Sequence, residues 1–227
     1  STASFTSVTF SVSSETTLPT DVFFKSDGLT MYVASNATPD TVFQYTLSTA
    51  WDISTASYAS KSVNVSAQEG TVLGIHFKTD GTKLYVIGID GDDVNQYSLS
   101  TAWDVSTASF DSVTFSVSSE TTAPASVWFN TDGLTMFVLA NGGTYADSVI
   151  QYDLTTAWDL STASFSASFS IASQELAPEG LAFSADGTKM YMVGAVNQTI
   201  YQYSTAVATT LTWPSSIEWA GGVAPSA

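Results

Sequence analysis

The sequence predicts an all-β protein, a four-bladed β-propeller closed by its N-terminal strand. Three observations support this prediction. Asp-Gly recurs four times at intervals of 53, 52 and 54 residues, Gln-Tyr recurs in step with it, and hydroxyl residues alternate with apolar ones. Alternation with a period of two is typical of β-strands that have one buried face. A long repeat that holds four short strands is typical of propeller blades.

Each repeat is expected to hold four strands, which in the first repeat include residues 22–24, 31–33, 44–47 and 62–65. Asp-Gly joins the first two strands, because glycine tolerates the positive φ that a tight hairpin needs. Thr-Ala-Trp-Asp joins the third strand to the fourth. A repeated apolar residue is more often core than ligand platform. We therefore expect three tryptophans to be buried in equivalent environments: Trp51, Trp103 and Trp158.

The two ends of the repeat array predict closure of the ring. The last repeat supplies three strands and stops near Tyr203, while residues 4–13 have the sequence of a fourth strand. Pairing these segments would leave no free sheet edge. We expect the propeller at residues 1–204 and a C-terminal tail or linker at 205–227, with Trp213 and Trp219 as a packing surface. A fragment of a longer array of blades is the alternative.

The composition excludes several classes of function. The 227 residues include five lysines, no arginine and 21 acidic residues, for a net charge of −16. Duplex nucleic acids require a basic surface, so no nucleic-acid partner is expected. Cysteine is absent, and the single histidine, His76, stands where the other repeats have Phe23, Trp128 and Ala182, so it is expected to pack in the core. No apolar run approaches 18 residues, so no membrane insertion is expected.

The repeats differ most in the loops between their second and third strands and in the crossings between repeats. Variable polar loops on a rigid scaffold suit recognition of a glycan or a protein. The loops cover residues 35–40, 88–93, 141–147 and 194–198. The candidate ligand-binding residues are Asn36, Asp40, Asp90, Asp92, Asn141, Tyr145 and Asn197 in the loops, and Glu15 and Glu120 in the crossings. Ordinary solvated loops are the alternative.

Two other kinds of site have weaker signals. Asp90, Asp92 and Asp93 carry three carboxylates that could hold Ca²⁺, although their spacing does not match an EF-hand loop, and no other cofactor is expected. Asp21 and Glu179 start inner strands and could act as acid and base on a glycosidic bond. No third polar partner is evident beside them. We therefore expect no enzymatic activity and keep a carboxylate-dependent glycoside hydrolase as the less favoured alternative.

The motif Gln-Tyr-x-Leu-Ser-Thr-Ala-Trp-Asp-x-Ser-Thr-Ala-Ser resembles repeats in tail-fibre and structural proteins of marine bacteriophages, as does the tail segment around Trp213 and Pro214. Residues 183–191 also resemble propeller repeats of bacterial surface proteins. The resemblance covers nearly the whole chain and implies a virion or extracellular location.

The expected function is a receptor-binding or decoration module that recognises a cell-surface glycan or protein. Its tail is expected to contact other virion or surface subunits. Neither the repeats nor the tail bring catalytic residues with them. A structural spacer is the alternative.

Overall fold

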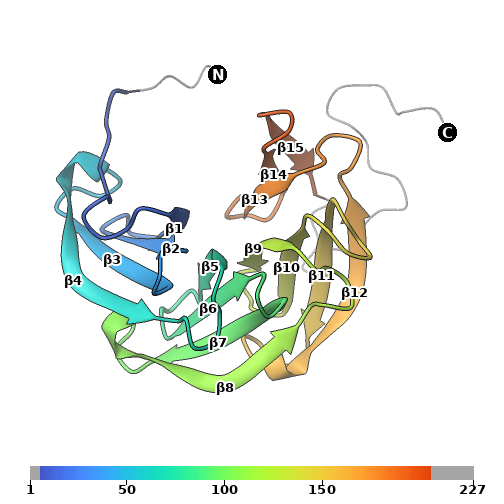
Figure 1. The fold of residues 1–227 in the computed structure, drawn as a ribbon, viewed down its shortest axis with the longest axis horizontal. Coiled ribbons are helices and arrows are strands. Elements are labelled where there is room, and N and C mark those ends of the chain that lie inside the picture. Colours follow the sequence, from blue (N-terminus) through green and yellow to red (C-terminus); the bar gives the residue numbers. More distant parts are fainter. Residues whose placement is uncertain (1–5, 206–227) are drawn as a thin grey trace. The chain divides into compact units, whose positions relative to one another are not determined.

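The computed structural model describes residues 6–205 as an all-β structure (Figure 1). Its strands form four antiparallel sheets, ordered β1-β2-β3-β4, β5-β6-β7-β8, β9-β10-β11-β12 and β13-β14-β15. Strands that follow one another in the sequence are neighbours in each sheet, which is the meander of a propeller blade. The chain is a four-bladed β-propeller, so the predicted fold class is confirmed.

The strands follow the sequence repeats blade by blade. Blade 1 contains β1 (Pro19–Phe24), β2 (Thr30–Ser35), β3 (Thr41–Leu47) and β4 (Ala56–Asn64). Blade 2 contains β5 (Val72–Phe77), β6 (Lys83–Gly88), β7 (Asp93–Leu99) and β8 (Ala108–Ser116). Blade 3 contains β9 (Pro124–Phe129), β10 (Thr135–Ala140), β11 (Ser148–Leu154) and β12 (Ala163–Ser170). Blade 4 contains β13 (Pro178–Phe183), β14 (Lys189–Gly194) and β15 (Ile200–Ser204).

The Asp-Gly turns and the Trp-Asp connections meet at one end of blades 1, 2 and 3. In blade 1, Gly28 has a φ of +70°, and the Trp51 ring lies where a side chain at this glycine would be. The backbone N–H of Trp51 donates to the Gly28 carbonyl at 2.9 Å. Both contacts recur between Gly81 and Trp103 and between Gly133 and Trp158. The tryptophans therefore clamp the hairpin turns, in agreement with their predicted packing role.

The three tryptophans differ in exposure, so the prediction that all are largely buried is wrong for one of them. Trp158 is 6% exposed and Trp51 is 60% exposed, whereas Trp103 is half-buried. The contacts within a blade are the same at all three positions. The difference in exposed fraction therefore does not come from the contacts that each tryptophan makes within its own blade.

Each Trp-Asp motif also begins a single 3₁₀ turn that the sequence patterns did not predict. The turns cover Ile53–Thr55, Val105–Thr107 and Leu160–Thr162. Asp52 caps the first of them, because its carboxylate accepts hydrogen bonds from the backbone N–H (3.0 Å) and the hydroxyl (2.6 Å) of Ser54. A single turn is too short to show a hydrophobic period in the sequence. The residue pattern Asp-x-Ser-Thr, in which Asp caps the turn, is the sequence signal that marks it.

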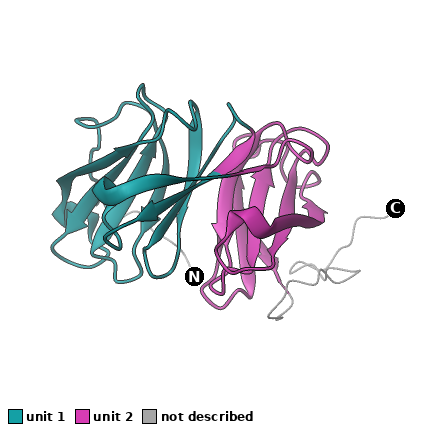
Figure 2. Cartoon of the chain, turned by 90° about the horizontal axis from the view of Figure 1, so that it is seen from below, with its two compact units in different colours: residues 1–91, 95–113 teal, residues 92–94, 114–227 magenta. Residues whose placement is uncertain are grey.

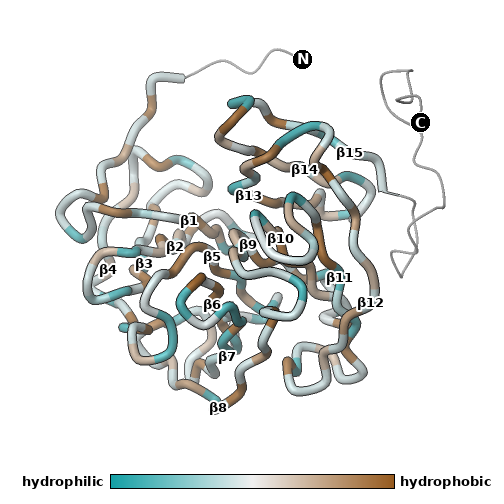
Figure 3. The backbone as a smooth tube through the Cα atoms, turned by 45° about the vertical axis from the view of Figure 1, so that its right-hand side comes forward, coloured by the Kyte–Doolittle hydropathy of each residue, from teal (hydrophilic) through white to brown (hydrophobic). Residues whose placement is uncertain are grey.

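The chain divides into two compact units (Figure 2), residues 1–91 with 95–113 and residues 92–94 with 114–227. The core of the first unit joins blade 1 to blade 2 and includes Tyr32, Ile75 and Val105, each at most 3% exposed. The core of the second unit joins blade 3 to blade 4 and includes Phe137 and Met190, each 0% exposed. Figure 3 colours the chain by residue hydropathy: hydrophobic residues occur along the strands, and many of the most hydrophilic residues lie in turns and loops.

The expected closing strand is not formed in the described residues. The sheet of blade 4 has three strands, and residues 6–13 have no strand assignment. Phe10 and Val12 instead pack on the core of blade 1, where the Phe10 ring meets Tyr45 edge-on with centroids 5.5 Å apart. Burial of apolar side chains does not require a backbone ladder, so this contact can hold the segment without completing a sheet.

The expected C-terminal tail lies almost entirely outside the described residues, and so do Trp213 and Trp219. Thr205 is the exception. It is buried, its backbone N–H donates to the Thr188 carbonyl at 3.0 Å, and its hydroxyl donates to the Gly187 carbonyl. Thr205 therefore contacts the hairpin turn of blade 4, directly after the last strand ends at Ser204.

Candidate functional site

The carboxylates and amides predicted in the crossings bind tyrosine hydroxyls of their own blades. Tyr45 donates to Glu15 Oε2 at 3.2 Å, and Tyr152 donates to Glu120 Oε2 at 3.1 Å. In blade 2 the equivalent donor, Tyr97, reaches Gln68 Oε1 at 3.0 Å. The repeated Gln-Tyr motif and the crossing residue are therefore hydrogen-bond partners. This contact gives Glu120 a structural role.

The next residue of each crossing is buried, as Thr16, Glu69, Thr121 or Glu175. Glu175 is 0% exposed, and its carboxylate accepts four hydrogen bonds from backbone N–H groups between residues 176 and 197. Burial acts to raise the pKa of Glu175, but these four donors together lower it.

Sequence reasoning missed these buried glutamates. The sequence signal that could have found them is a pair of positions that change together from one repeat to the next, one in the crossing and one at the end of the second strand. Glu69 and Glu175 each face a glycine, Gly88 or Gly194, that has no room for a side chain. The blades with threonine at this position have Ser35 or Ala140 in place of the glycine.

Asp40, Asp92 and Asp147 have a common backbone role in the loops. Their carbonyls accept hydrogen bonds of 2.8–2.9 Å from Val65, Val117 and Ile171, which follow the outer strands. Asp40 is also 4% exposed, and its carboxylate accepts a hydrogen bond from the Val72 N–H at 3.3 Å. The Asp40 carboxylate is therefore engaged within the blade architecture, and its role in ligand binding stays a prediction.

The environment of Asp92 differs from that of Asp40 because of one proline. Pro124 has the register position in blade 3 that Val72 has in blade 2, since each pairs with the last residue of the second strand. Proline has no backbone N–H to donate. Asp92 Oδ1 is buried without a hydrogen-bond partner.

Asp90 and Asn197 are exposed but use their side chains within the loops. Asp90 Oδ1 accepts the Thr71 hydroxyl at 2.9 Å. Asn197 Nδ2 donates to the Gln174 carbonyl at 2.5 Å. Both residues lie in loops of the predicted face, where these hydrogen bonds hold each loop against a crossing.

The remaining loop candidates are half-buried. Asn36 and Asn141 donate through their backbone N–H groups to the carbonyls of Leu18 and Ala123. Tyr145 stacks on Phe165 with centroids 5.4 Å apart and an angle of 15° between the rings. One face of the predicted aromatic platform is therefore already covered.

Carboxylates do not converge on a metal site in the part of the chain that the structure describes. Within residues 6–205 there is no group of three histidine, cysteine, aspartate or glutamate side chains that could hold a metal ion. Asp90, Asp92 and Asp93 therefore do not form the predicted cluster. His76 is buried, and its ring meets Phe23 edge-on at 5.4 Å, in agreement with its predicted packing role.

A polar pocket of about 300 Å³ lies in blade 1, on the predicted binding face. It brings Glu15 together with the loop at 35–40 and the end of β4. Hydroxyl, amide and carboxylate groups line it together with one aromatic ring. Its lining residues are Glu15, Ser35, Ala37, Thr38, Pro39, Thr41, Phe43, Ser62 and Asn64.

A second pocket, of about 370 Å³, is mostly apolar and includes Asp21. The Asp21 carboxylate accepts hydrogen bonds from the backbone N–H groups of Val22 (2.8 Å) and Ile75 (2.9 Å). Burial outweighs these two donors and raises the pKa of Asp21 to about 6. Glu179, the other predicted carboxylate, belongs to the second unit and is exposed.

Comparison with known proteins identifies the fold. No family model and no curated sequence matches the chain. Solved propeller structures do match it. A functionally unknown protein from Desulfotomaculum acetoxidans is 16% identical with a TM-score of 0.57, over 82% of this chain and 51% of that one. A "putative 6-phosphogluconolactonase" from Bacteroides fragilis is 13% identical with a TM-score of 0.57, over 82% and 50%. The periplasmic gluconolactonase of Pseudomonas aeruginosa is 17% identical with a TM-score of 0.56, over 84% and 54%.

These matches correct one prediction. The chain spans about half the length of these structures, two of which are named as lactonases. The expectation that the chain has no enzymatic activity is therefore withdrawn, because the fold it shares is found in proteins named as hydrolytic enzymes. Among the described residues, no helix is long and apolar enough to cross a membrane.

Proposed function

We propose that this chain recognises a neutral, hydroxyl-rich ligand such as a glycan in the polar pocket of blade 1. The observation behind this proposal is the lining of that pocket. Glu15, Asn64 and several hydroxyls surround a space of about 300 Å³, with the Phe43 ring among them. Small-molecule sites combine an apolar surface with a few convergent polar groups in this way.

Each part of the pocket suits one feature of a sugar. The Glu15 carboxylate can accept hydrogen bonds from ring hydroxyls, and the Asn64 Nδ2 can donate to their oxygens. The Phe43 ring and Pro39 offer an apolar surface to the C–H face of the ring. The net charge of −16 and the absence of arginine disfavour anionic ligands. A neutral glycan fits these groups better than a phosphorylated or sulfated one.

The biological setting of this binding is a separate part of the proposal. The resemblance of the repeats to phage tail-fibre proteins supports display on a virion or another extracellular surface. In that setting the module would bind a glycan or a protein on a cell, while residues 205–227 would contact neighbouring subunits.

The test is a substitution that removes one charge and leaves the fold intact. Glu15→Gln keeps an acceptor for the Tyr45 hydroxyl, because Gln68 has that role in blade 2. We expect it to weaken binding of neutral oligosaccharides about 10-fold, since a charged acceptor is replaced by a neutral one. Glycan-array screening followed by calorimetry measures the effect.

The control for this test is Glu120→Gln. It changes the same hydrogen bond in blade 3, to Tyr152, but Glu120 does not line the pocket. Equal binding by the wild-type chain and Glu15→Gln would contradict the proposal. So would an equal loss in both variants, because that would indicate a general effect on the blades.

Hydrolysis of a sugar lactone is a second candidate function. Two structural neighbours carry lactonase names. Asp21, with a pKa of about 6, could remove a proton from the water that attacks the lactone carbonyl. The ring C–O bond of the tetrahedral intermediate then breaks, and the protonated Asp21 returns its proton to the leaving ring oxygen, which becomes the hydroxyl of the product acid. A net charge of −16 without arginine favours an uncharged lactone over a phosphorylated one.

The hydrolytic candidate predicts a pH profile. Hydrolysis of glucono-δ-lactone, measured above the uncatalysed rate, should rise with pH through about 6, because Asp21 must be deprotonated to act as a base. Asp21→Asn should abolish the catalysed rate, whereas Glu179→Gln should not change it. A rate at the uncatalysed level in the wild-type chain would exclude this candidate.

A further inference from the structure

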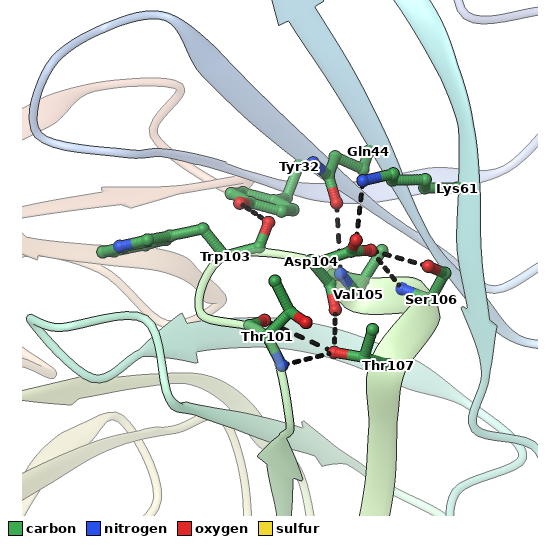
Figure 4. Close-up of polar contacts among 9 residues, drawn as sticks. All are labelled: Tyr32, Gln44, Lys61, Thr101, Trp103, Asp104, Val105, Ser106 and Thr107. Carbon is green, nitrogen blue, oxygen red and sulfur yellow. Dashed lines mark hydrogen bonds and ion pairs between the residues drawn. The ribbon is translucent and has the colours of Figure 1, made fainter.

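Blade 1 binds the start of the Trp-Asp connection of blade 2 (Figure 4). Gln44 Oε1 accepts a hydrogen bond from the Val105 N–H at 3.1 Å, and Val105 is two residues after Trp103. The Tyr32 hydroxyl donates to the Trp103 carbonyl at 2.7 Å. The Trp103 ring covers the turn glycine of its own blade, Gly81. The connection therefore has two functions: its ring clamps the turn of its own blade, and its backbone binds the preceding blade.

The turn of blade 4 has the same backbone but no tryptophan over it in the described residues. Gly187 has a φ of +67°, close to the +70° to +73° of the turn glycines in the other blades. In residues 6–205, no atom lies within 4 Å of the position that a side chain at Gly187 would take, whereas a tryptophan ring occupies it in blades 1, 2 and 3. Those three glycines are buried, and Gly187 is half-buried. The described part of blade 4 thus lacks the ring that covers each of the other turns.

The acceptor for the backbone of this missing connection is present in blade 3. Gln151 has the register position of Gln44, since each pairs with the third residue of the second strand in its blade. Gln151 is 4% exposed, and its Nε2 donates to Asp153 Oδ1 at 2.9 Å, which identifies Oε1 as the acceptor. That oxygen is buried and has no hydrogen-bond partner among residues 6–205. Because a buried acceptor without a donor is costly, we expect the donor to come from the rest of the chain.

The other contact of this interface is not repeated in blade 3. Phe137 has the register position of Tyr32 and has no hydroxyl to donate. The hydrogen bond that remains for the backbone of blade 4 to make is therefore the one to Gln151.

Thr205 shows where the missing connection would begin. Its N–H donates to the Thr188 carbonyl at 3.0 Å, which is the bond that Leu47 makes at the end of β3. Trp51 follows Leu47 after four residues. The chain therefore leaves blade 4 at the place where blades 1, 2 and 3 begin their Trp-Asp connections.

The sequence limits which tryptophan can cover Gly187. Of the six tryptophans in the chain, three clamp the turns of their own blades, and Trp128 packs on the core of the second unit. Trp213 and Trp219 remain, eight and fourteen residues after Thr205. A shorter loop loses less conformational entropy when it closes, which favours Trp213.

We infer that the C-terminal segment docks on blade 4 of its own chain, with the Trp213 ring over Gly187. Ser215 then follows the ring by two residues, as the donor of blade 2 does, and its N–H binds Gln151 Oε1. The intervening proline has no N–H, so Ser215 is the first donor after the ring. This docking completes the turn clamp of blade 4 and leaves residues 216–227 for contacts with neighbouring subunits.

Paramagnetic broadening in the full chain tests this docking. The sequence has no cysteine, so Ala185→Cys provides a single thiol for a nitroxide label beside the turn of blade 4. The label leaves room for the ring, because the corresponding residues of the other three turns are exposed although a tryptophan covers each turn. With 5-fluorotryptophan in the chain, we expect loss of the ¹⁹F resonance of Trp213, while the resonance of Trp219 is broadened less.

The same label in blade 2 gives the reference. Thr79 is the counterpart of Ala185, and Trp103 covers the glycine two residues further on, Gly81. A nitroxide on the Thr79→Cys variant should therefore remove the Trp103 resonance, and the loss at Trp213 in the Ala185→Cys variant should match it. Replacing one tryptophan at a time by phenylalanine assigns the resonances.

Three results of this experiment would overturn the inference. A sharp Trp213 resonance in the labelled Ala185→Cys variant would show that the turn stays open. Stronger broadening of Trp219 than of Trp213 would show that a different tryptophan docks. Broadening in a mixture of labelled chains without fluorine and fluorinated chains without a label would show that the segment of a second copy docks instead.

Amide exchange tests the contact with Gln151. The Ser215 N–H should exchange about 10-fold or more slowly than in an unfolded chain, and Gln151→Leu should remove this protection. The Val105 N–H, which is bonded to Gln44, is the internal reference for a protected amide that the variant leaves unchanged. Equal protection of Ser215 in the wild-type chain and in Gln151→Leu would contradict its assignment as the donor.

Discussion

Replacing His76 by phenylalanine is expected to remove a large part of the acid sensitivity of the fold. His76 is 5% exposed, and burial lowers its pKa to about 3. The unfolded chain has a histidine pKa near 6.5, so the unfolded state takes up the proton first as the pH falls. The stability that neutral His76 allows is therefore complete above about pH 6.5 and is lost progressively down to about pH 3.

The size of this effect makes it measurable. A difference between pKa values of 6.5 and about 3 corresponds to at most about 5 kcal/mol, of which about 3 kcal/mol falls between pH 6.5 and about 4.5. His76 is the sole histidine, so the assignment is direct. Phenylalanine is the residue of blade 1 at this position, Phe23, and should therefore fit.

Urea unfolding at several pH values measures the prediction as the difference between the two chains. Asp21 acts in the opposite direction, because its raised pKa makes the fold more stable as the pH falls through about 6. This contribution is present in both chains and cancels. Carboxyls with lowered pKa values, such as Asp80 and Asp186 at about 2, lose their stabilising effect only below about pH 4. Parallel pH curves for the wild-type chain and His76→Phe would contradict the prediction.

The strands and turns could be predicted because their signals are local and repeated. Asp27-Gly28 marks a hairpin whatever surrounds it, and the alternation in residues 62–65 assigns a strand from a few neighbours. Four copies of the same pattern then reduce the chance of misreading any one. The fold class follows from these signals alone.

The roles of the site residues could not be predicted in the same way, because they depend on partners distant in the sequence. Glu15 was predicted to bind a ligand, yet its carboxylate also holds Tyr45, 30 residues away. Asp40 was also predicted to bind a ligand, and its carboxylate accepts a hydrogen bond from Val72, which is 32 residues away. A comparison of the repeats position by position, Glu15 with Gln68 and Glu120, would have paired each acceptor with its tyrosine.

The exposure of a residue also depends on which blade lies next to it. Trp51 and Trp158 have the same sequence neighbours and the same contact with the glycine of their turn. They differ tenfold in exposed fraction, 60% against 6%. Because their sequence context is almost identical, the sequence could not predict this difference in exposure. The two substitutions to alanine should therefore differ in their cost to stability.

Trp158→Ala is expected to destabilise the chain by about 3–5 kcal/mol, the usual cost of removing an enclosed large aromatic side chain. Its ring stacks on Phe129 at 5.4 Å and covers Gly133. Trp51→Ala should cost about 1 kcal/mol or less, since more than half of that side chain is already in water. The backbone φ is +65° at Trp158 and +64° at Trp51, so alanine meets the same backbone strain at both positions and the comparison isolates the side chain.

Urea unfolding of both variants at neutral pH, followed by circular dichroism, measures the two losses. The chain has two compact units, so the transition that reports the second unit is the one to compare for Trp158. Equal losses at the two positions would show that the turn clamp within the blade accounts for the stability, and that burial beyond the blade does not. A strong destabilisation by Trp51→Ala alone would contradict the prediction, because it would mean that the Trp51 side chain is covered in solution.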